Sequence, residues 1–222
     1  MAPSLELPPV PGPVTVRRYR EGDQAEVVPL LYASSGGMYD RFAGSRELAE
    51  QTIARALGRE GTTASADVVW VAELDGRPAG AMAAMPYHEW TPRAHRFLRT
   101  TLRSIPVRRW PSALWLYRSS GRTAPEPPRK SLYVDSLATA RERRRLGVAR
   151  TLLEEAERVA RESGLSILAL DTWQDNRGAR ALYLDAGFEE VAYTPATGVV
   201  PGGVSLVKEL SGARAGRSPM ID

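Results

Sequence analysis

Residues 140–151 have the sequence ARERRRLGVART and connect an apolar segment, residues 132–139, to a segment with helical periodicity, residues 147–163. A glycine where a strand leads into a helix lets backbone N–H groups approach an anion without a Cβ in the way, and the helix dipole favours negative charge there. Thr151 adds a hydroxyl, and further positive charge comes from three arginines, Arg144, Arg145 and Arg150. The segment predicts a phosphate-binding turn, although a basic turn before a helix is also typical of a solvated surface loop.

Strands and helices are predicted along the rest of the chain. Apolar segments predict strands at residues 14–18, 68–74, 78–85, 132–139, 166–172, 188–193 and 204–210. Helical periodicity predicts helices at residues 45–57, 147–163 and 177–186. A further helix is expected after Asp23, which has Glu26 three residues on, as in a capping box. Pro29 predicts a kink or a late start of that helix, and Asp75-Gly76 predicts a tight hairpin.

Two sequence motifs lie in the second half of the chain. Arg144-Arg145-Leu146-Gly147-Val148-Ala149 matches the pattern (Q/R)-x-x-G-x-(G/A), and residues 176–188, NRGARALYLDAGF, match Asn-x-x-Ala-x-x-Leu-Tyr-x-x-x-Gly-Phe at every named position. Together they resemble the acyl-CoA signature and the second motif of the GNAT N-acyltransferases, loosely over residues 14–85 and closely over residues 131–210. The resemblance implies an α/β GNAT fold. Its mixed, mostly antiparallel twisted sheet would have six to seven strands flanked by about four helices, with a helical insertion between strands three and four.

The resemblance also implies the ligand of the turn. GNAT enzymes use acetyl-CoA or another acyl-CoA as co-substrate, with the pantetheine arm between the splayed fourth and fifth strands, here residues 132–139 and 166–172, and the diphosphate on the amides of residues 145–149. No metal site is predicted. The predicted cofactor-binding residues are Leu137, Thr139, Arg144, Arg145, Leu146, Gly147, Val148, Ala149, Arg150, Thr151, Asn176 and Tyr183.

The implied reaction is transfer of an acetyl group to a primary amine by direct attack in a ternary complex, which requires an acid for the leaving thiolate and a route for the amine proton. Tyr183 of the second motif is the predicted acid, since a phenol of pKa about 10 is protonated at neutral pH; the alternative is a packing residue.

Asp135 is the predicted base, because some family members carry a catalytic glutamate at this offset. Alternatively, it binds the substrate ammonium or a neighbouring arginine. His88 is a second candidate base, and water a third.

Residues 86–130 interrupt the pattern with ten Arg or Lys and two Glu, a local net charge of +8. An amphipathic helix is predicted at residues 93–105, with Arg96, Arg99 and Arg103 on one flank and Leu98, Leu102 and Ile105 on another. A second helix is predicted near Pro111, with Trp110, Leu114 and Tyr117 as its buried side. The interpretations of this basic insertion are a helical cap with solvated arginines, a lid that selects an acidic or nucleotide-bearing acceptor, a homodimer contact, or a nucleic-acid surface that stacks bases on Trp90, Trp110 and Trp115.

Composition restricts the remaining possibilities. The chain has no cysteine, which excludes disulfides, zinc–thiolate sites and a cysteine nucleophile. It contains no run of 18 apolar residues and no secretory pattern at the N-terminus, so a cytoplasmic location without membrane association is expected. One domain is predicted at residues 14–210, between a Pro-rich flexible leader, residues 1–13, and a flexible tail, residues 211–222. The predicted partner is a small-molecule or protein amine. A non-catalytic acyl-CoA-binding module remains an alternative, and nucleic-acid binding ranks lower.

Overall fold

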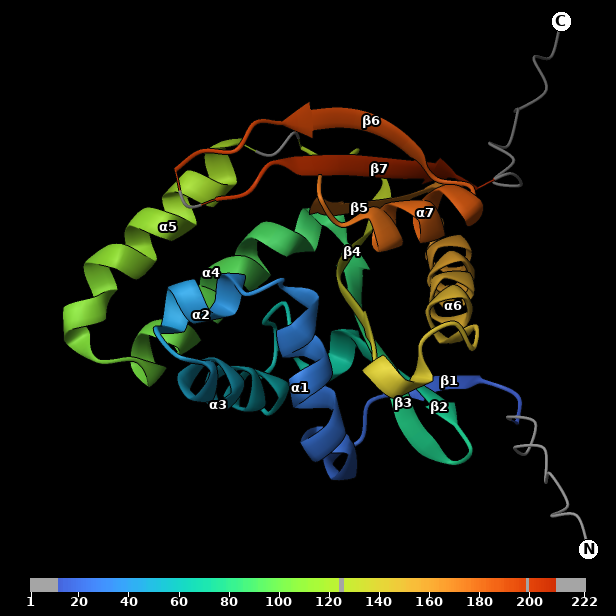
Figure 1. The fold of residues 1–222 in the computed structure, drawn as a ribbon, viewed down its shortest axis with the longest axis horizontal. Coiled ribbons are helices and arrows are strands. Elements are labelled where there is room, and N and C mark those ends of the chain that lie inside the picture. The colour runs from blue at the N-terminus through green and yellow to red at the C-terminus, as the bar shows by residue number, and fades with distance from the viewer. Residues whose placement is uncertain (1–11, 124–125, 199, 211–222) are drawn as a thin grey trace, which may run out of the picture.

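The protein folds around one twisted sheet of seven strands in the order β1-β2-β3-β4-β5-β7-β6 (Figure 1). The computed structural model describes residues 12–123, 126–198 and 200–210, so nearly all of the predicted leader and the whole predicted tail lie outside the described residues. Neighbouring strands are antiparallel except β4 and β5. The strands are β1 Thr15–Arg18, β2 Val69–Leu74, β3 Arg77–Pro86, β4 Ser131–Thr139, β5 Ile167–Trp173, β6 Glu189–Thr194 and β7 Gly203–Glu209.

Helices cover both faces of this sheet. The α-helices are α1 Gln24–Ser34, α2 Met38–Ala43, α3 Arg46–Leu57, α4 Tyr87–Ser104, α5 Trp110–Thr123, α6 Val148–Glu162 and α7 Arg177–Asp185. One apolar core joins the sheet to α6 and α7, and a second joins it to α1 and α3. Figure 1 shows α6 and α1 on opposite sides of β3 and β4. The predicted mixed α/β fold with helices inserted between the third and fourth strands is therefore confirmed.

Local sequence signals explain several of these boundaries. Asp75 and Gly76 both adopt positive φ, 53° and 71°, which is the backbone of the tight hairpin that joins β2 to β3. The hydroxyl of Ser45 accepts a hydrogen bond from the N–H of Leu48 at 3.3 Å and so caps α3. Gly164, with φ 69°, ends α6. These elements depend on residues close together in sequence, which is why periodicity and turn chemistry predicted them.

The predicted capping box at Asp23 and Glu26 is wrong. The carboxylate of Asp23 turns back along the chain, accepts from the N–H of Arg20 at 2.8 Å, and pairs with Arg17 at 2.7 Å. A paired guanidinium is a stronger partner for a carboxylate than a helix N–H group. Helix α1 nevertheless starts at Gln24, and Pro29 lies inside it, so the helix does not begin late.

The inserted helices also differ from the prediction. Helix α4 starts at Tyr87, before the predicted residue 93. Among residues 110–119 of α5, Ala113 and Leu116 are buried, whereas the predicted Leu114 and Tyr117 are half-buried and Trp110 is exposed. Helix α5 packs against α2 and α4. Within the described part of the chain, no helix combines the length and the apolar character needed to cross a bilayer.

Strands β4 and β5 pair along only part of their length. Their parallel register runs from Ser131 opposite Ile167 to Val134 opposite Leu170, although β4 continues to Thr139 and β5 to Trp173. The two strands therefore separate after Val134 and Leu170. The space between the strands lies between the helices on one face of the sheet and those on the other.

Candidate active site

Two carboxylates lie where β4 and β5 separate. Asp135 follows Val134 on β4, and Asp171 follows Leu170 on β5, so each is the first residue beyond the last parallel pair. Asp135 is also the extra residue of a β-bulge, because Val134 pairs with Ala84 while Ser136 pairs with the preceding residue of β3. A bulge redirects a side chain that regular pleating would place elsewhere. Both carboxylates line a cavity that is described below.

The turn before α6 presents unpaired backbone donors. The N–H groups of residues 144–150 make no hydrogen bond to any other described residue. Arg145 has φ 63° and Gly147 has φ 83°, left-handed conformations that curl the chain and let successive N–H groups converge on an anion. The side chains of Arg144, Arg145 and Arg150 are exposed. These features are compatible with a bound diphosphate, which stays a prediction. Thr151 lies one turn into the helix, and its hydroxyl donates to the Gly147 carbonyl at 3.3 Å.

The remaining predicted cofactor residues surround the separation of the strands. Leu137 is half-buried against the α6 side of the sheet, and Thr139 ends β4 with a buried hydroxyl that has no partner among the described residues. Asn176 caps α7: its Oδ1 accepts from the N–H of Ala179 at 3.3 Å, and its Nδ2 donates to Thr172 at 3.2 Å. The side chain of Asn176 is thus engaged in positioning α7.

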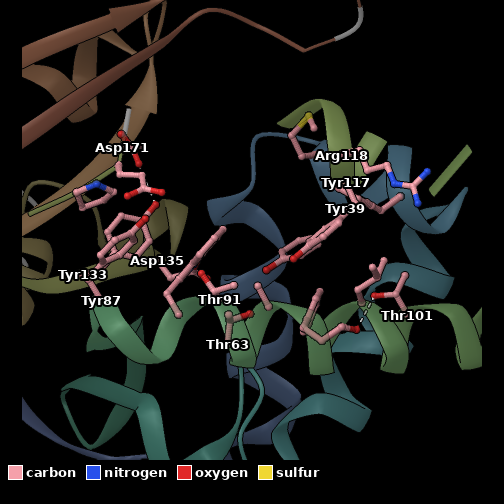
Figure 2. Close-up of a pocket in the computed structure, with 18 residues that line it drawn as sticks. Tyr39, Thr63, Tyr87, Thr91, Thr101, Tyr117, Arg118, Tyr133, Asp135 and Asp171 are labelled. Carbon is pink, nitrogen blue, oxygen red and sulfur yellow. Dashed lines mark hydrogen bonds between the residues drawn. The ribbon is translucent and has the colours of Figure 1, made fainter. Parts of the chain in front are cut away.

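A cavity of about 610 Å³ adjoins the two carboxylates. In Figure 2, Asp135, Asp171, Tyr133 and Tyr87 lie together at one end, and Tyr117, Arg118 and Thr101 lie at the other. The walls come from α2, the inserted helices α4 and α5, and strands β4 and β5. The basic insertion therefore builds most of a pocket beside the separation of the strands. Its volume is in the range of pockets that bury small organic molecules.

Asp135 is held in an environment that favours its neutral form. Burial raises its pKa to about 6, and the nearby charge of Asp171 adds to the rise, while hydrogen bonds from Trp90 and Ser136 oppose it. The indole N–H of Trp90 donates to Oδ1 of Asp135 at 2.6 Å. A carboxylate with this pKa is mostly ionised at neutral pH and accepts a proton more readily than an ordinary aspartate. The arrangement suits a general base.

Asp171 is a site residue that sequence reasoning missed. Its Oδ2 accepts from the hydroxyl of Tyr133 at 2.9 Å, and its Oδ1 accepts from Ser205. Asp171 is an exposed residue, but its carboxylate is partly desolvated beside the cavity, and this desolvation raises its pKa. A signal for it does exist in the sequence, because LYVD at residues 132–135 and LALD at residues 168–171 place an aspartate after three mostly apolar residues in two predicted strands.

Tyr183 lies on the other face of the sheet. It is buried in the core with α6, and its ring contacts Phe188 at a centroid distance of 5.8 Å. Burial raises its pKa to about 12. Its hydroxyl makes no hydrogen bond to another residue in the described ranges. Tyr183 and Asp135 thus approach the separation of the strands from opposite sides of the sheet, which leaves the role of Tyr183 as a proposal.

Two other groups from the sequence analysis lie away from the carboxylates. His88 is exposed in the first turn of α4 and is not among the residues that line the cavity, so the structure does not support it as the base. Arg96, Arg99 and Arg103 line a separate hollow of about 190 Å³, together with residues of the segment that follows α3. These three arginines therefore do not line the cavity, although α4 and α5 of the insertion form part of its walls.

Comparison with known proteins decides the family. The sequence model of the acetyltransferase (GNAT) family matches residues 37–188. The chain belongs to this family. Among curated relatives, GCN5-related N-acetyltransferase 7, chloroplastic, of Arabidopsis thaliana is 34% identical over 64 residues, which cover 29% of this GNAT chain and 23% of that relative.

Solved structures agree with the GNAT assignment. An N-acetyltransferase from Staphylococcus aureus Mu50 superposes with a TM-score of 0.65 at 14% identity, over 87% of this chain and 99% of that one. The ribosomal-protein-S18-alanine N-acetyltransferase from Escherichia coli superposes with a TM-score of 0.53 at 15% identity, over 92% and 99%. At such identities the likeness shows the fold. The predicted GNAT fold and family are confirmed, and the family uses acetyl-CoA.

Proposed function

We propose that this protein transfers an acetyl group from acetyl-CoA to a primary amine by direct attack in a ternary complex. One observation carries the proposal. The parallel pairing of β4 and β5 ends at Val134 and Leu170, and the next residue of β4 is Asp135, a cavity-lining carboxylate with its pKa raised to about 6. A general base is most effective when its pKa lies near the ambient pH. An amine in the cavity would meet this base where the strands separate.

Groups without partners support a site for acetyl-CoA. The N–H groups of residues 144–150 suit the diphosphate, and the edge of β4 beyond Val134, which no longer pairs with β5, suits the amides of the pantetheine arm. When bound, acetyl-CoA supplies the acetyl group as an activated thioester. Arg144, Arg145 and Arg150 would add charge around the phosphates, and Asn176 would hold the start of α7 against the other wall.

The proposed roles of Asp135 and Tyr183 divide between the two faces of the sheet. Asp135 accepts the proton that the amine nitrogen must lose as its bond to the acetyl carbon forms. Tyr183 acts on the opposite side, at the sulfur whose bond to that carbon breaks. Its pKa of about 12 keeps the phenol protonated. Because this value is above that of a thiol, near 8.5, Tyr183 serves the departing thiolate best as a hydrogen-bond donor.

The structure favours this proposal over the two alternatives. A non-catalytic acyl-CoA-binding module would require the insertion to close the acceptor side, yet α4 and α5 enclose an open volume of about 610 Å³. The nucleic-acid interpretation stacks bases on Trp90, Trp110 and Trp115, of which Trp110 and Trp115 are exposed but Trp90 is not free for stacking. The Trp90 indole instead faces the cavity and donates to Asp135.

A matched pair of glycine variants tests acetyl-CoA binding at the turn. Gly147 and Gly164 have φ 83° and 69°, lie at opposite ends of α6, and have no neighbouring atom within 4 Å of an added Cβ. Replacing either by alanine therefore costs a similar amount, roughly 1–2 kcal/mol of folding stability. Only Gly147→Ala places a methyl group where the phosphates would approach.

Thermal melting with acetyl-CoA measures the difference. The wild type and Gly164→Ala are expected to gain stability, about 2.7 kcal/mol at a hundred times the dissociation constant. Gly147→Ala is expected to lose most of this gain. Absence of a shift in the wild type at millimolar acetyl-CoA would overturn the proposed function. Equal shifts in both variants would remove the diphosphate from the turn.

A further inference from the structure

We propose that the cavity beside Asp135 and Asp171 is the acceptor site and takes a primary amine carried on an aromatic, apolar body, such as an arylalkylamine. The ammonium group would lie at the carboxylate end, and the body would extend along the aromatic wall. This inference rests on the proposed acetyl transfer and adds the substrate class. It also assigns a role to Asp171, as a binding group for the cation.

The charge of the lining selects a cation. Three carboxylates, those of Asp135, Asp171 and Glu126, line the cavity, against one guanidinium, that of Arg118. Figure 2 shows the guanidinium of Arg118 directed away from the carboxylates. The insertion has a local excess of +8, but Arg96, Arg99 and Arg103 line the separate hollow, so this charge does not reach the cavity. A pocket lined by charge of one sign concentrates ligands of the opposite sign.

Aromatic rings complete the carboxylate end. The rings of Tyr87, Trp90 and Tyr133 are mutual neighbours, with centroid separations of 6.4, 5.9 and 6.0 Å. The N–H of Trp90 and the hydroxyl of Tyr133 are used by Asp135 and Asp171, so these hydrogen bonds fix the orientation of the carboxylates. Ring faces attract an ammonium ion within about 6 Å of the centroid. The end of the cavity therefore combines two fixed carboxylates with aromatic faces.

The rest of the lining suits an apolar body. Side chains of α2, α4 and α5 form this wall, namely Met38, Tyr39, Phe42, Phe97, Leu98 and Tyr117. The hydroxyl of Thr101 is directed to the carbonyl of Phe97 at 3.0 Å and so is already used within its own helix. A second ammonium group, or the repeated amides of a peptide, would lose water here without gaining enough partners. The wall thus disfavours a polyamine or a protein N-terminus relative to an arylalkylamine.

Four amines and one carboxylate separate the effect of charge from that of the aromatic ring. The purified full chain with saturating acetyl-CoA is assayed for thiol release with 2-phenylethylamine, 1-butylamine, 1,4-diaminobutane and a tetrapeptide with N-terminal alanine. We expect kcat/KM for 2-phenylethylamine to exceed each of the others by at least about tenfold, since burial of a phenyl group supplies this much. Thermal melting with 3-phenylpropanoate, which has the same ring and the opposite charge, should show no stabilisation, whereas 2-phenylethylamine should stabilise the protein.

Two variants and a control locate the effect. Asp171→Asn is expected to raise KM for 2-phenylethylamine about tenfold with a smaller change in kcat, and Leu98→Gln should raise it by several fold. Val107→Gln changes an exposed residue of the insertion, outside the cavity, and should leave KM unchanged. Acetyl-CoA should stabilise all of these proteins equally. If Asp171→Asn lowers only the melting temperature and leaves KM intact, Asp171 is structural and its assigned role is overturned.

The outcomes separate this inference from the proposed function. If acetyl-CoA stabilises the protein and diaminobutane or the peptide is the better acceptor, acetyl transfer stands and the aromatic acceptor class is overturned. If acetyl-CoA neither binds nor is consumed with any amine, the proposed function fails. In that case the acceptor role of the cavity is overturned with it, and the melting experiment decides only the ligand class: stabilisation by 2-phenylethylamine and not by 3-phenylpropanoate supports a site for an aromatic amine, and any other result overturns that as well.

Discussion

Replacing Asp135 by asparagine should make the protein more stable at pH 8. Burial raises the pKa of Asp135 from its ordinary value of 3.8 to about 6, so ionisation of this group lowers the free energy of unfolding. Two pKa units at about 1.4 kcal/mol each correspond to about 3 kcal/mol of lost stability above pH 6. Asparagine keeps the shape and an acceptor for Trp90 but carries no charge. In a domain of this size, about 3 kcal/mol is a rise in melting temperature of about 6–12 °C.

The pH dependence gives the sign of the effect. Because the folded state holds the proton of Asp135 more tightly than the unfolded state, wild-type stability falls as pH rises from about 4 to about 6 and is then constant with respect to this group. Near pH 4.5 the side chain is already neutral in the folded protein, so the advantage of Asp135→Asn should shrink to about 1 kcal/mol. The nearby charge of Asp171 contributes to the raised pKa of Asp135. Removing the charge of Asp135 therefore also removes its repulsion of Asp171, which stabilises the variant further.

Thermal melting of both proteins between pH 4.5 and pH 8 measures this difference. Asp185→Asn is the matched control, because Asp185 is exposed on α7 and its replacement removes a charge from solvent only. A difference between wild type and Asp135→Asn that is equal at all pH values, or a variant that is less stable at pH 8, would refute the raised pKa and with it the argument for Asp135 as the base.

Two further predictions concern the groups outside the cavity. Tyr183→Phe should lower kcat about 10²-fold, the effect of removing one hydrogen-bond donor to a developing negative charge, and leave the stabilisation by acetyl-CoA nearly unchanged, because only the hydroxyl is lost. Initial rates and melting curves measure the two effects, and an unchanged kcat would make Tyr183 a packing residue. The second variant replaces Arg96, Arg99 and Arg103 together by Gln. Its kcat/KM for amine acceptors should equal that of the wild type at low and at high salt, because these side chains line a separate hollow. A kcat/KM that falls and becomes less sensitive to salt would show that their charge does act on the acceptor.

The features that depend on neighbouring residues were predictable. The turn at residues 144–149 combines a glycine with positive φ and a following amphipathic helix, and the hairpin at Asp75-Gly76 needs only its own backbone conformation. The second motif lies on α7 as expected, with Asn176 as the cap. In each case the energetic preference arises within one turn or one strand–helix junction, so it is written in contiguous sequence.

The features that depend on contacts between distant residues were not predictable from the sequence. Arg17 competes for Asp23 and removes the predicted capping box, a contact that no local pattern of α1 reports. Which flank of α4 faces the cavity depends on how the helix packs against α2 and β4. The charge of residues 86–130 left an acidic acceptor open as one interpretation, whereas the tertiary structure forms a cavity with two carboxylates at one end.

The sequence alone determined the family, the alternation of strands and helices, the turn that suits a diphosphate and the candidacy of Asp135, because motifs and periodicity act over short distances. Only the tertiary structure decided that Asp171 joins Asp135, that Trp90 and Tyr133 orient the two carboxylates, and that the arginines of α4 face elsewhere. The physical reason is that burial and charge–charge interaction depend on separation in space. The parallel pairing of β4 and β5 brings residues 36 positions apart in the chain to the same point, which no local pattern specifies.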